Sequence, residues 1–182
     1  MVTPSSRPSS SRWVRGCRSA AVPFVVLVDS LGRPLASSIA EQTTVNDDRL
    51  KRASILAWVE TLRLVTTDGI AQRRAIDHVY AQIASGSEAQ TFISEFYRAG
   101  PPFKRAQAET VSVEVNSVLP TSDRTFEVDW VETTRDLYGG VKATDRWKGS
   151  FSIALNPPTD ERLARINPLG VYVTNVSWAK VL

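Results

Sequence analysis

The chain has 182 residues, of which 42% are hydrophobic and 23% charged, which is ordinary for one folded domain with its own core. Its single cysteine, Cys17, cannot form an internal disulfide, and one histidine with one cysteine is too few for a structural zinc site. The net charge of +3 comes from the first eighteen residues, because without their four arginines 18 basic residues (22 − 4) face 19 acidic ones. The sequence therefore predicts no phosphate-binding surface on the folded body and no direct contact with nucleic acid.

Residues 1–19 are rich in Ser, Pro and Arg and have almost nothing to bury, so we expect a disordered or loosely docked basic tail. Residues 20–182 are expected to form a single domain. A membrane-spanning helix needs ~20 apolar residues, and the longest apolar run, residues 20–28, is shorter and is interrupted by Pro23. An alternative interpretation takes residues 12–28 as a signal peptide with cleavage near residues 38–40, but Pro23 and Asp29 disrupt that pattern.

Two short strands are expected next, at residues 24–29 and 35–40, on either side of a turn. Three helices follow. The first is capped by Asn46 or Asp47 and runs to about residue 65, the second is capped by Asp68, and the third covers about residues 88–98 before Gly100-Pro101-Pro102 stops it. Helical spacing predicts these inner faces, helix by helix: Leu50, Ile55, Val59, Leu62 and Val65; Ile70, Ile76, Val79, Tyr80 and Ile83; Phe92, Ile93, Phe96 and Tyr97.

Everything after Pro102 is predicted to be β structure, apart from one helical turn at residues 159–163. Apolar and polar residues alternate over residues 111–115, 126–130 and 147–155, and a final apolar run covers residues 171–178. Turns are expected at residues 120–123 and at Gly139-Gly140. The pattern indicates an α+β fold in which helices pack into the concave face of a curved antiparallel sheet.

Candidates for catalysis are few. His78 follows Asp77, but no Ser or Cys is nominated as its nucleophile, so we expect a helix-surface or half-buried histidine. Glu127, Asp129 and Glu132 could supply paired carboxylates, yet Glu127 and Asp129 fall on the polar face of one strand, where acids are usually solvated. The inward-facing candidates of three strands include no carboxylate and no histidine. We therefore expect a packed core or an apolar groove rather than an enzyme.

A series of fragments, in this order and spacing, resembles a known family. The fragments are Val22-Pro23-Phe24-Val25-Val26-Leu27-Val28-Asp29, residues 68–80, Pro102-Phe103-Lys104-Arg105-Ala106, residues 126–135, Asn156-Pro157-Pro158 and Asn167-Pro168-Leu169-Gly170. Together they resemble the TrbF family of conjugal transfer proteins, related to the VirB-type inner-membrane scaffold proteins of type IV secretion.

The resemblance implies the cone-shaped fold of nuclear transport factor two and a non-catalytic scaffold role, without a cofactor. It implies contact with other type IV secretion envelope components, weak dimerisation or higher self-association, and a domain that faces the periplasm from the bacterial inner membrane. Family members carry a membrane helix just before the segment that matches residues 22–29. That helix is missing from this sequence, so we expect that it was left off, was lost, or precedes a misplaced start.

The resemblance also implies interaction residues. The family's Asn-Pro-x-Gly turn lies at a surface linked to self-association and partner contact, and it corresponds to Asn167, Pro168, Leu169 and Gly170. The aromatic residues Tyr97, Phe103 and Tyr172 are further candidates, because aromatic side chains anchor interfaces. Each of the three could instead be a core residue, and the turn could serve only to set the register of the last strand. A second hypothesis is a small-ligand-binding or enzymatic cone-fold protein with its site inside the cone.

Overall fold

The computed structural model describes residues 24–28, 34–39, 48–159 and 161–181. They belong to two compact units, divided between Thr43 and Thr44. In the first unit, β1 (Phe24–Val28) pairs antiparallel with β2 (Pro34–Ile39), so both strands expected here are present. The tail at residues 1–19 and the proposed helix caps Asn46 and Asp47 lie outside the described residues. The single domain expected from residue 20 stays a prediction.

The second unit contains an antiparallel meander in the order β3 (Thr110–Ser122), β4 (Thr125–Arg135), β5 (Val141–Leu155) and β6 (Val171–Val181). The predicted alternation is confirmed on β4, where Phe126, Val128 and Trp130 are buried. The first hairpin turn lies later than expected, because Pro120 remains in the strand opposite Phe126. Since β3 is an edge strand, a proline that cannot donate a hydrogen bond is tolerated there.

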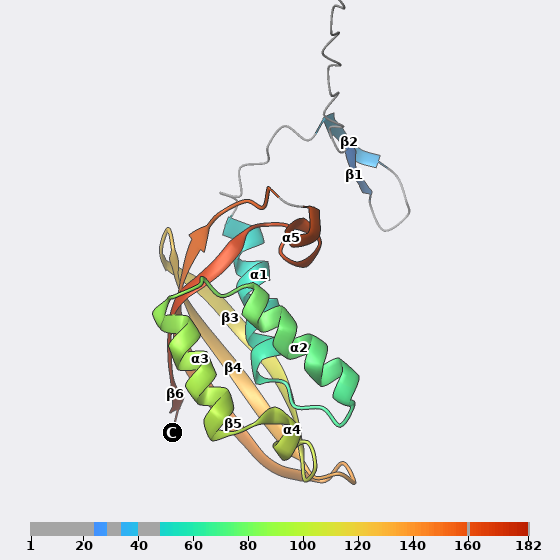
Figure 1. The fold of residues 1–182 in the computed structure, drawn as a ribbon, viewed down its shortest axis with the longest axis vertical. Helices are drawn as coiled ribbons and strands as arrows, with labels where there is room; N and C mark the ends of the chain where they lie inside the picture. Colours follow the sequence, from blue (N-terminus) through green and yellow to red (C-terminus); the bar gives the residue numbers. More distant parts are fainter. Residues whose placement is uncertain (1–23, 29–33, 40–47, 160, 182) are drawn as a thin grey trace, which may run out of the picture. The chain divides into compact units, whose positions relative to one another are not determined.

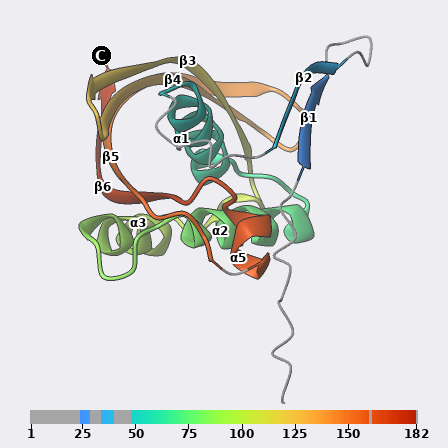
Figure 2. The same ribbon diagram turned by 90° about the horizontal axis from the view of Figure 1, so that it is seen from above.

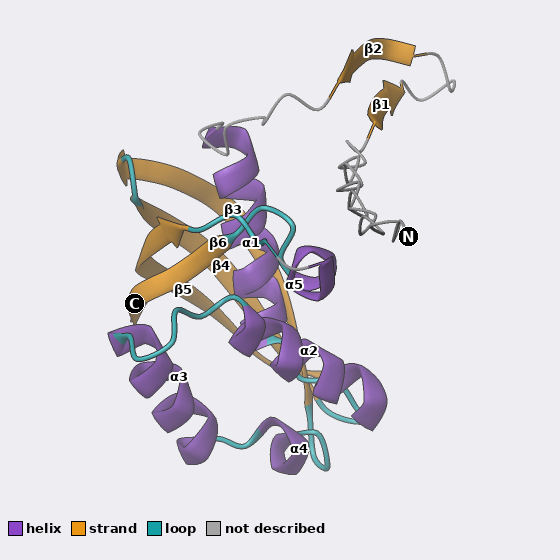
Figure 3. Ribbon diagram, turned by 45° about the horizontal axis from the view of Figure 1, so that its top comes forward, coloured by secondary structure: helices purple, strands orange, loops and turns teal. Residues whose placement is uncertain are grey.

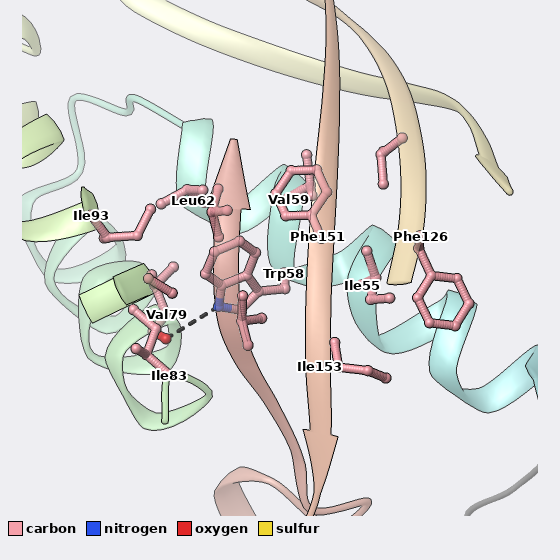
Figure 4. Close-up of a cluster of buried hydrophobic side chains, with 14 of the residues drawn as sticks. Ile55, Trp58, Val59, Leu62, Val79, Ile83, Ile93, Phe126, Phe151 and Ile153 are labelled. Carbon is pink, nitrogen blue, oxygen red and sulfur yellow. Dashed lines mark hydrogen bonds between the residues drawn. The ribbon is translucent and has the colours of Figure 1, made fainter. Parts of the chain in front are cut away.

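Three helices close the concave side of this sheet. Figure 2 shows α1 (Asp48–Arg63) inside the curve of the sheet, with α2 (Gly69–Ala81) and α3 (Glu88–Ala99) across its open side. The core forms between these layers, and Trp58 lies at its centre (Figure 4). Its indole Nε1 donates to the carbonyl oxygen of Val79 at 3.2 Å, and its ring meets Phe151 edge-on at 6.0 Å. The α+β class is confirmed.

The inner face predicted for α2 is partly wrong. Val79 and Ile83 are buried, whereas Ile70 is 68% exposed and Tyr80 is 37% exposed. The buried row contains Gln72 instead, because its side chain accepts a hydrogen bond from the Thr66 backbone nitrogen and donates to the Leu64 carbonyl oxygen. Both bonds are made to the α1–α2 connection, and they satisfy a polar side chain that hydrophobic periodicity alone assigns to solvent.

Two further elements need correction. Phe92, expected on the inner face of α3, is 37% exposed. The prediction of β structure after Pro102 is wrong for the first residues of that segment, which form the short helix α4 (Pro102–Arg105). Proline is tolerated in the first turn of a helix, because the N–H group that it lacks has no hydrogen-bond partner within the helix there. The single helical turn expected at residues 159–163 is present slightly later, as α5 (Glu161–Ile166).

Candidate interaction site

The turn between α5 and β6 is built around the side chain of Asn167, which is 3% exposed. Its Nδ2 donates to the carbonyl oxygen of Val171 at 2.9 Å, and its Oδ1 accepts from the Val171 backbone nitrogen at 3.2 Å. The backbone nitrogen of Gly170 donates to the Asn167 carbonyl oxygen at 3.1 Å. The hydrogen bonds of Asn167 therefore fix the position at which β6 begins.

Gly170 makes the closest approach in this turn. Its φ is +60°, and a Cβ built on it would lie 2.2 Å from the carbonyl oxygen of Asn156. The Asn156 backbone nitrogen also donates to the Gly170 carbonyl oxygen at 2.8 Å. Only glycine accommodates both the positive φ and this contact. The Asn156-Pro157-Pro158 and Asn167-Pro168-Leu169-Gly170 fragments, separate in the sequence, are therefore packed against each other.

The predicted interaction residues of this region differ in their exposure. Asn167 and Gly170 are buried, Leu169 is half-buried against the core, and Pro168 is exposed. Tyr172 is half-buried and alternates with buried residues of β6, so its ring lies on the outer face of the sheet. The surface that this turn offers to another molecule is thus Pro168, part of Leu169 and part of Tyr172.

The other two predicted residues lie elsewhere. The hydroxyl of Tyr97 donates to the Leu62 carbonyl oxygen at 3.1 Å inside the domain. Burial, reinforced by the neighbouring Tyr80, raises the pKa of the Tyr97 hydroxyl well above its ordinary value. Phe103 is 42% exposed on α4, and the guanidinium of Arg73 lies 5.9 Å from its ring centroid. Figure 1 places α4 at the opposite end of this unit from α5, so the predicted residues do not form one surface.

The expectation that no inward-facing residue is a carboxylate is wrong at Glu132. The alternation of β4 continues one step past Trp130 and buries Glu132, whose side chain forms an ion pair with the Nε of Arg63 on α1. The indole Nε1 of Trp130 also donates to Glu132 at 2.8 Å. Extending the period-two pattern by two residues would have found this carboxylate, but the sequence alone does not nominate Arg63 as its partner.

Aromatic rings seal this ion pair from solvent. The Arg63 guanidinium carbon lies 4.5 Å from the ring centroid of Trp147, 4.8 Å from Phe96 and 5.1 Å from Trp178. The side chain of Arg63 is 6% exposed and that of Glu132 is 9% exposed. An acid that must exchange protons with a substrate needs an open path to it. This pair has none, so its arrangement fits a structural link between α1 and the sheet.

The remaining titratable candidates make local contacts on α2 and on the outer face of the sheet. His78 is half-buried, and its Nε2 lies 2.7 Å from the side-chain nitrogen of Gln82. Glu127 accepts from Lys148 at 2.8 Å on the outer sheet face, which raises the pKa of the lysine. Asp129 accepts a hydrogen bond from a neighbouring serine. Across the described ranges, no group of three or more His, Cys, Asp or Glu side chains is placed to hold a metal ion.

Several open hollows lie on the surface of the second unit. One of about 450 Å³ is lined by side chains of α3 alone, from Gln90 to Arg98. Another of about 350 Å³ lies over β5 and β6 beside Lys148 and Ser177. Among the residues that the structure describes, no helix has both the length and the apolar character needed to cross a bilayer.

Comparison with known proteins gives one consistent result. Residues 13–181 match the family model described as VirB8 protein. The conjugal transfer protein TrbF of Rhizobium radiobacter is 34% identical over 161 residues, which is 88% of this chain and 73% of that protein.

Solved structures show the same fold. The VirB8 protein of Agrobacterium tumefaciens superposes with a TM-score of 0.65 at 15% identity, over 78% of this chain and 96% of that one. A TrwG component of type IV secretion from Bartonella birtlesii gives a TM-score of 0.62 at 17% identity, over 74% and 92% of the two chains.

Proposed function

Because the chain belongs to the VirB8 protein family, we propose that it is a non-catalytic scaffold component of a type IV secretion system that carries out conjugative DNA transfer. The observation that carries the proposal is the 34% identity to a conjugal transfer protein over most of both chains. The family and the fold expected from the sequence fragments are both confirmed.

The interior of the second unit supports a role without catalysis. An enzyme of this cone-shaped class keeps an acid–base group in an open cavity inside the cone, whereas here the ion pair of Arg63 and Glu132 is enclosed by aromatic rings. The rest of the inner space is filled by core side chains such as Trp58 and Phe151 (Figure 4). No feature of the described part of the chain favours the alternative of a small-ligand-binding or enzymatic protein.

For the interaction surface, we propose that Pro168, Leu169 and Tyr172 make the contacts, while Asn167 and Gly170 hold the turn in shape. This assignment follows from the exposure of the first three and the internal hydrogen bonds of the other two. So small a surface gives weak association in a single contact. Repetition in a multi-subunit assembly would offset that weakness through effective concentration.

We further propose that the second unit faces the periplasm and that a membrane helix of the kind carried by the family holds it at the inner membrane. Its partners would then be the other envelope components of the same machine, and its self-association would be weak. Neither cofactor nor nucleic acid takes part in this role, which depends on protein contacts alone.

Co-purification of the secretion machine tests the proposal. In donor membranes from a strain that lacks this gene, the other envelope components should no longer purify as one cross-linked complex, and a plasmid-borne copy behind a membrane helix should restore it. A Pro168→Asp copy should restore it poorly although the protein remains folded, because a charge then replaces an exposed apolar contact. An intact complex in the deletion strain would refute the scaffold role.

A further inference from the structure

The start of α2, α4 and the β4–β5 hairpin lie at one end of the second unit, opposite the first turn of α1 (Figures 1 and 3). Each of these elements carries exposed apolar residues, and we call these five residues the distal end: Ile70, Phe103, Leu137, Tyr138 and Val141. Tyr138 is 100% exposed, Val141 62% and Leu137 52%. Exposed apolar groups gathered in one place mark interaction sites more often than single exposed residues do.

Side-chain contacts tie the three elements of the distal end together. The guanidinium of Arg73 on α2 lies over the ring of Phe103 on α4, 5.9 Å from its centroid. Glu109, just before β3, accepts hydrogen bonds from Lys142 of β5 at 2.8 Å and from Arg105 of α4 at 2.9 Å. These two bonds, first from Lys142 and then from Arg105, lower the pKa of the Glu109 carboxyl. The hairpin, α4 and α2 therefore present one continuous end.

The tip of the hairpin is held in a defined shape although the side chains of Leu137 and Tyr138 are exposed. Asp136 Oδ1 accepts from the backbone nitrogens of Tyr138 at 2.9 Å and Gly140 at 2.8 Å. Backbone hydrogen bonds also join Asp136 to Gly139 and to Gly140, and Gly139 supplies a φ of +90°. A preorganised tip loses little conformational entropy on binding. Most of the free energy gained by burying its apolar side chains therefore remains available for affinity.

Charge at the distal end is unbalanced. Its carboxylates already have partners within the chain. Asp68 caps α2, Glu109 forms ion pairs with Arg105 and Lys142, and Asp136 accepts hydrogen bonds from the backbone of the hairpin turn. Arg73 and Lys104 are exposed, and neither has a carboxylate partner among the described residues. The surface thus combines an apolar tip with uncompensated positive charge on one side, at α2 and α4.

We infer that the distal end binds a partner protein of the secretion machine through a segment that presents apolar side chains flanked by carboxylates. The inference rests on the proposed function, since it assigns a face to the partners which that function requires. A flat anionic membrane is less suitable, because Glu109 offsets one of the two positive charges that Lys142 and Arg105 bring to the side of the tip. An acidic segment that lies across the tip and α4 would meet both parts of the surface.

The chain offers a matched control for this surface. Leu119 is 52% exposed near the β3–β4 hairpin, at the other end of the same sheet, and its exposure equals that of Leu137. A change at Leu119 removes the same kind of exposed apolar group without touching the distal end. A difference between Leu137→Ser and Leu119→Ser therefore reports the position of the leucine and not general surface hydrophobicity.

The experiment measures binding of the full chain to the purified periplasmic domains of the other envelope components, one at a time, by biolayer interferometry. We expect one component to bind the unchanged chain and Leu119→Ser equally. The double variant Leu137→Ser with Tyr138→Ser should bind at least about tenfold more weakly, because central aromatic anchors dominate interfaces. Lys104→Glu should weaken binding about threefold or more at low salt and less at high salt.

Three results would overturn the inference. Equal binding by the double variant and the Leu119→Ser control would show that the distal end is not the binding surface. Binding to vesicles of phosphatidylethanolamine and phosphatidylglycerol that the double variant loses would assign the tip to a lipid. Self-association in sedimentation velocity that the double variant loses would assign it to a second copy of the chain.

Plasmid transfer separates failure of the inference from failure of the proposed function. The inference predicts that the double variant lowers transfer at least about tenfold, in line with its binding defect, while its melting temperature stays unchanged. If deletion of the gene abolishes transfer and the double variant transfers normally, the scaffold role stands and the inference fails. If deletion itself leaves transfer unchanged, the proposed function fails instead.

Discussion

Replacement of Gly170 by alanine tests how the turn before β6 is held. Alanine at a φ of +60° costs about 1 kcal/mol of unfolding free energy from backbone strain alone. Its Cβ would also meet the carbonyl oxygen of Asn156 at 2.2 Å, so the two turns must separate. Displacement of packed backbone adds about 1 kcal/mol or more, and a weakened hydrogen bond between Asn156 and Gly170 adds about another 1 kcal/mol. We expect a total of about 3 kcal/mol.

Gly86 provides the matched control. Its φ is +73°, and a Cβ built there meets nothing within 4 Å, so Gly86→Ala should cost only the backbone term of about 1 kcal/mol. Urea unfolding followed by tryptophan fluorescence gives both values, and thermal melts should show drops of roughly 10 °C for Gly170→Ala and roughly 3 °C for the control. Equal destabilisation of the two variants would refute the claim that contact with Asn156 fixes the turn.

Three other substitutions test the interior and the ion pairs. Glu132→Leu should lower the unfolding free energy by about 3 kcal/mol, because Arg63 stays buried without its carboxylate partner. In urea titrations, the double variant Glu132→Leu with Arg63→Met should recover most of that loss. Losses of the two single variants that simply add in the double variant would contradict this. Glu109→Gln should be less stable than the unchanged chain at pH 7, because a carboxyl group whose pKa is lowered by folding stabilises the fold at pH values above its ordinary pKa of 4.5. The difference in melting temperature should shrink as the pH falls below 4.5 and vanish below the lowered pKa of the folded state, and a difference that persists there would exclude the carboxylate as its cause. Tyr97→Phe should cost about 1 kcal/mol in urea, since it removes the hydrogen bond to Leu62; no loss would show that the bond contributes nothing.

Strand periodicity predicted the sheet well, since a period of two depends only on which face is buried. The same rule, continued from Trp130 to Glu132, would have predicted the buried carboxylate. Its partner Arg63 lies 69 positions away in the sequence, and only the packing of α1 against the sheet brings the two together. Hydrophobic periodicity misplaced the face of α2 for a different reason, because Gln72 is buried by hydrogen bonds that a hydrophobicity pattern does not contain.

The interaction residues were predictable only in part. The asparagine, proline and glycine of residues 167–170 predicted a turn, but the contact of Gly170 with Asn156 depends on the β5–β6 register, which the sequence does not specify. The exposure of Tyr138 was also hidden, because an aromatic residue beside a Gly-Gly turn can equally fold back onto the sheet. Tertiary packing decides both.

Plasmid transfer from a donor that lacks this gene tests the scaffold role most directly. The strain would be complemented with this chain alone or with the same chain fused behind a membrane helix, and transfer frequency would be counted per donor. Deletion should abolish transfer, and the anchored form should restore it. Transfer that continues unchanged in the deletion strain would contradict the scaffold role.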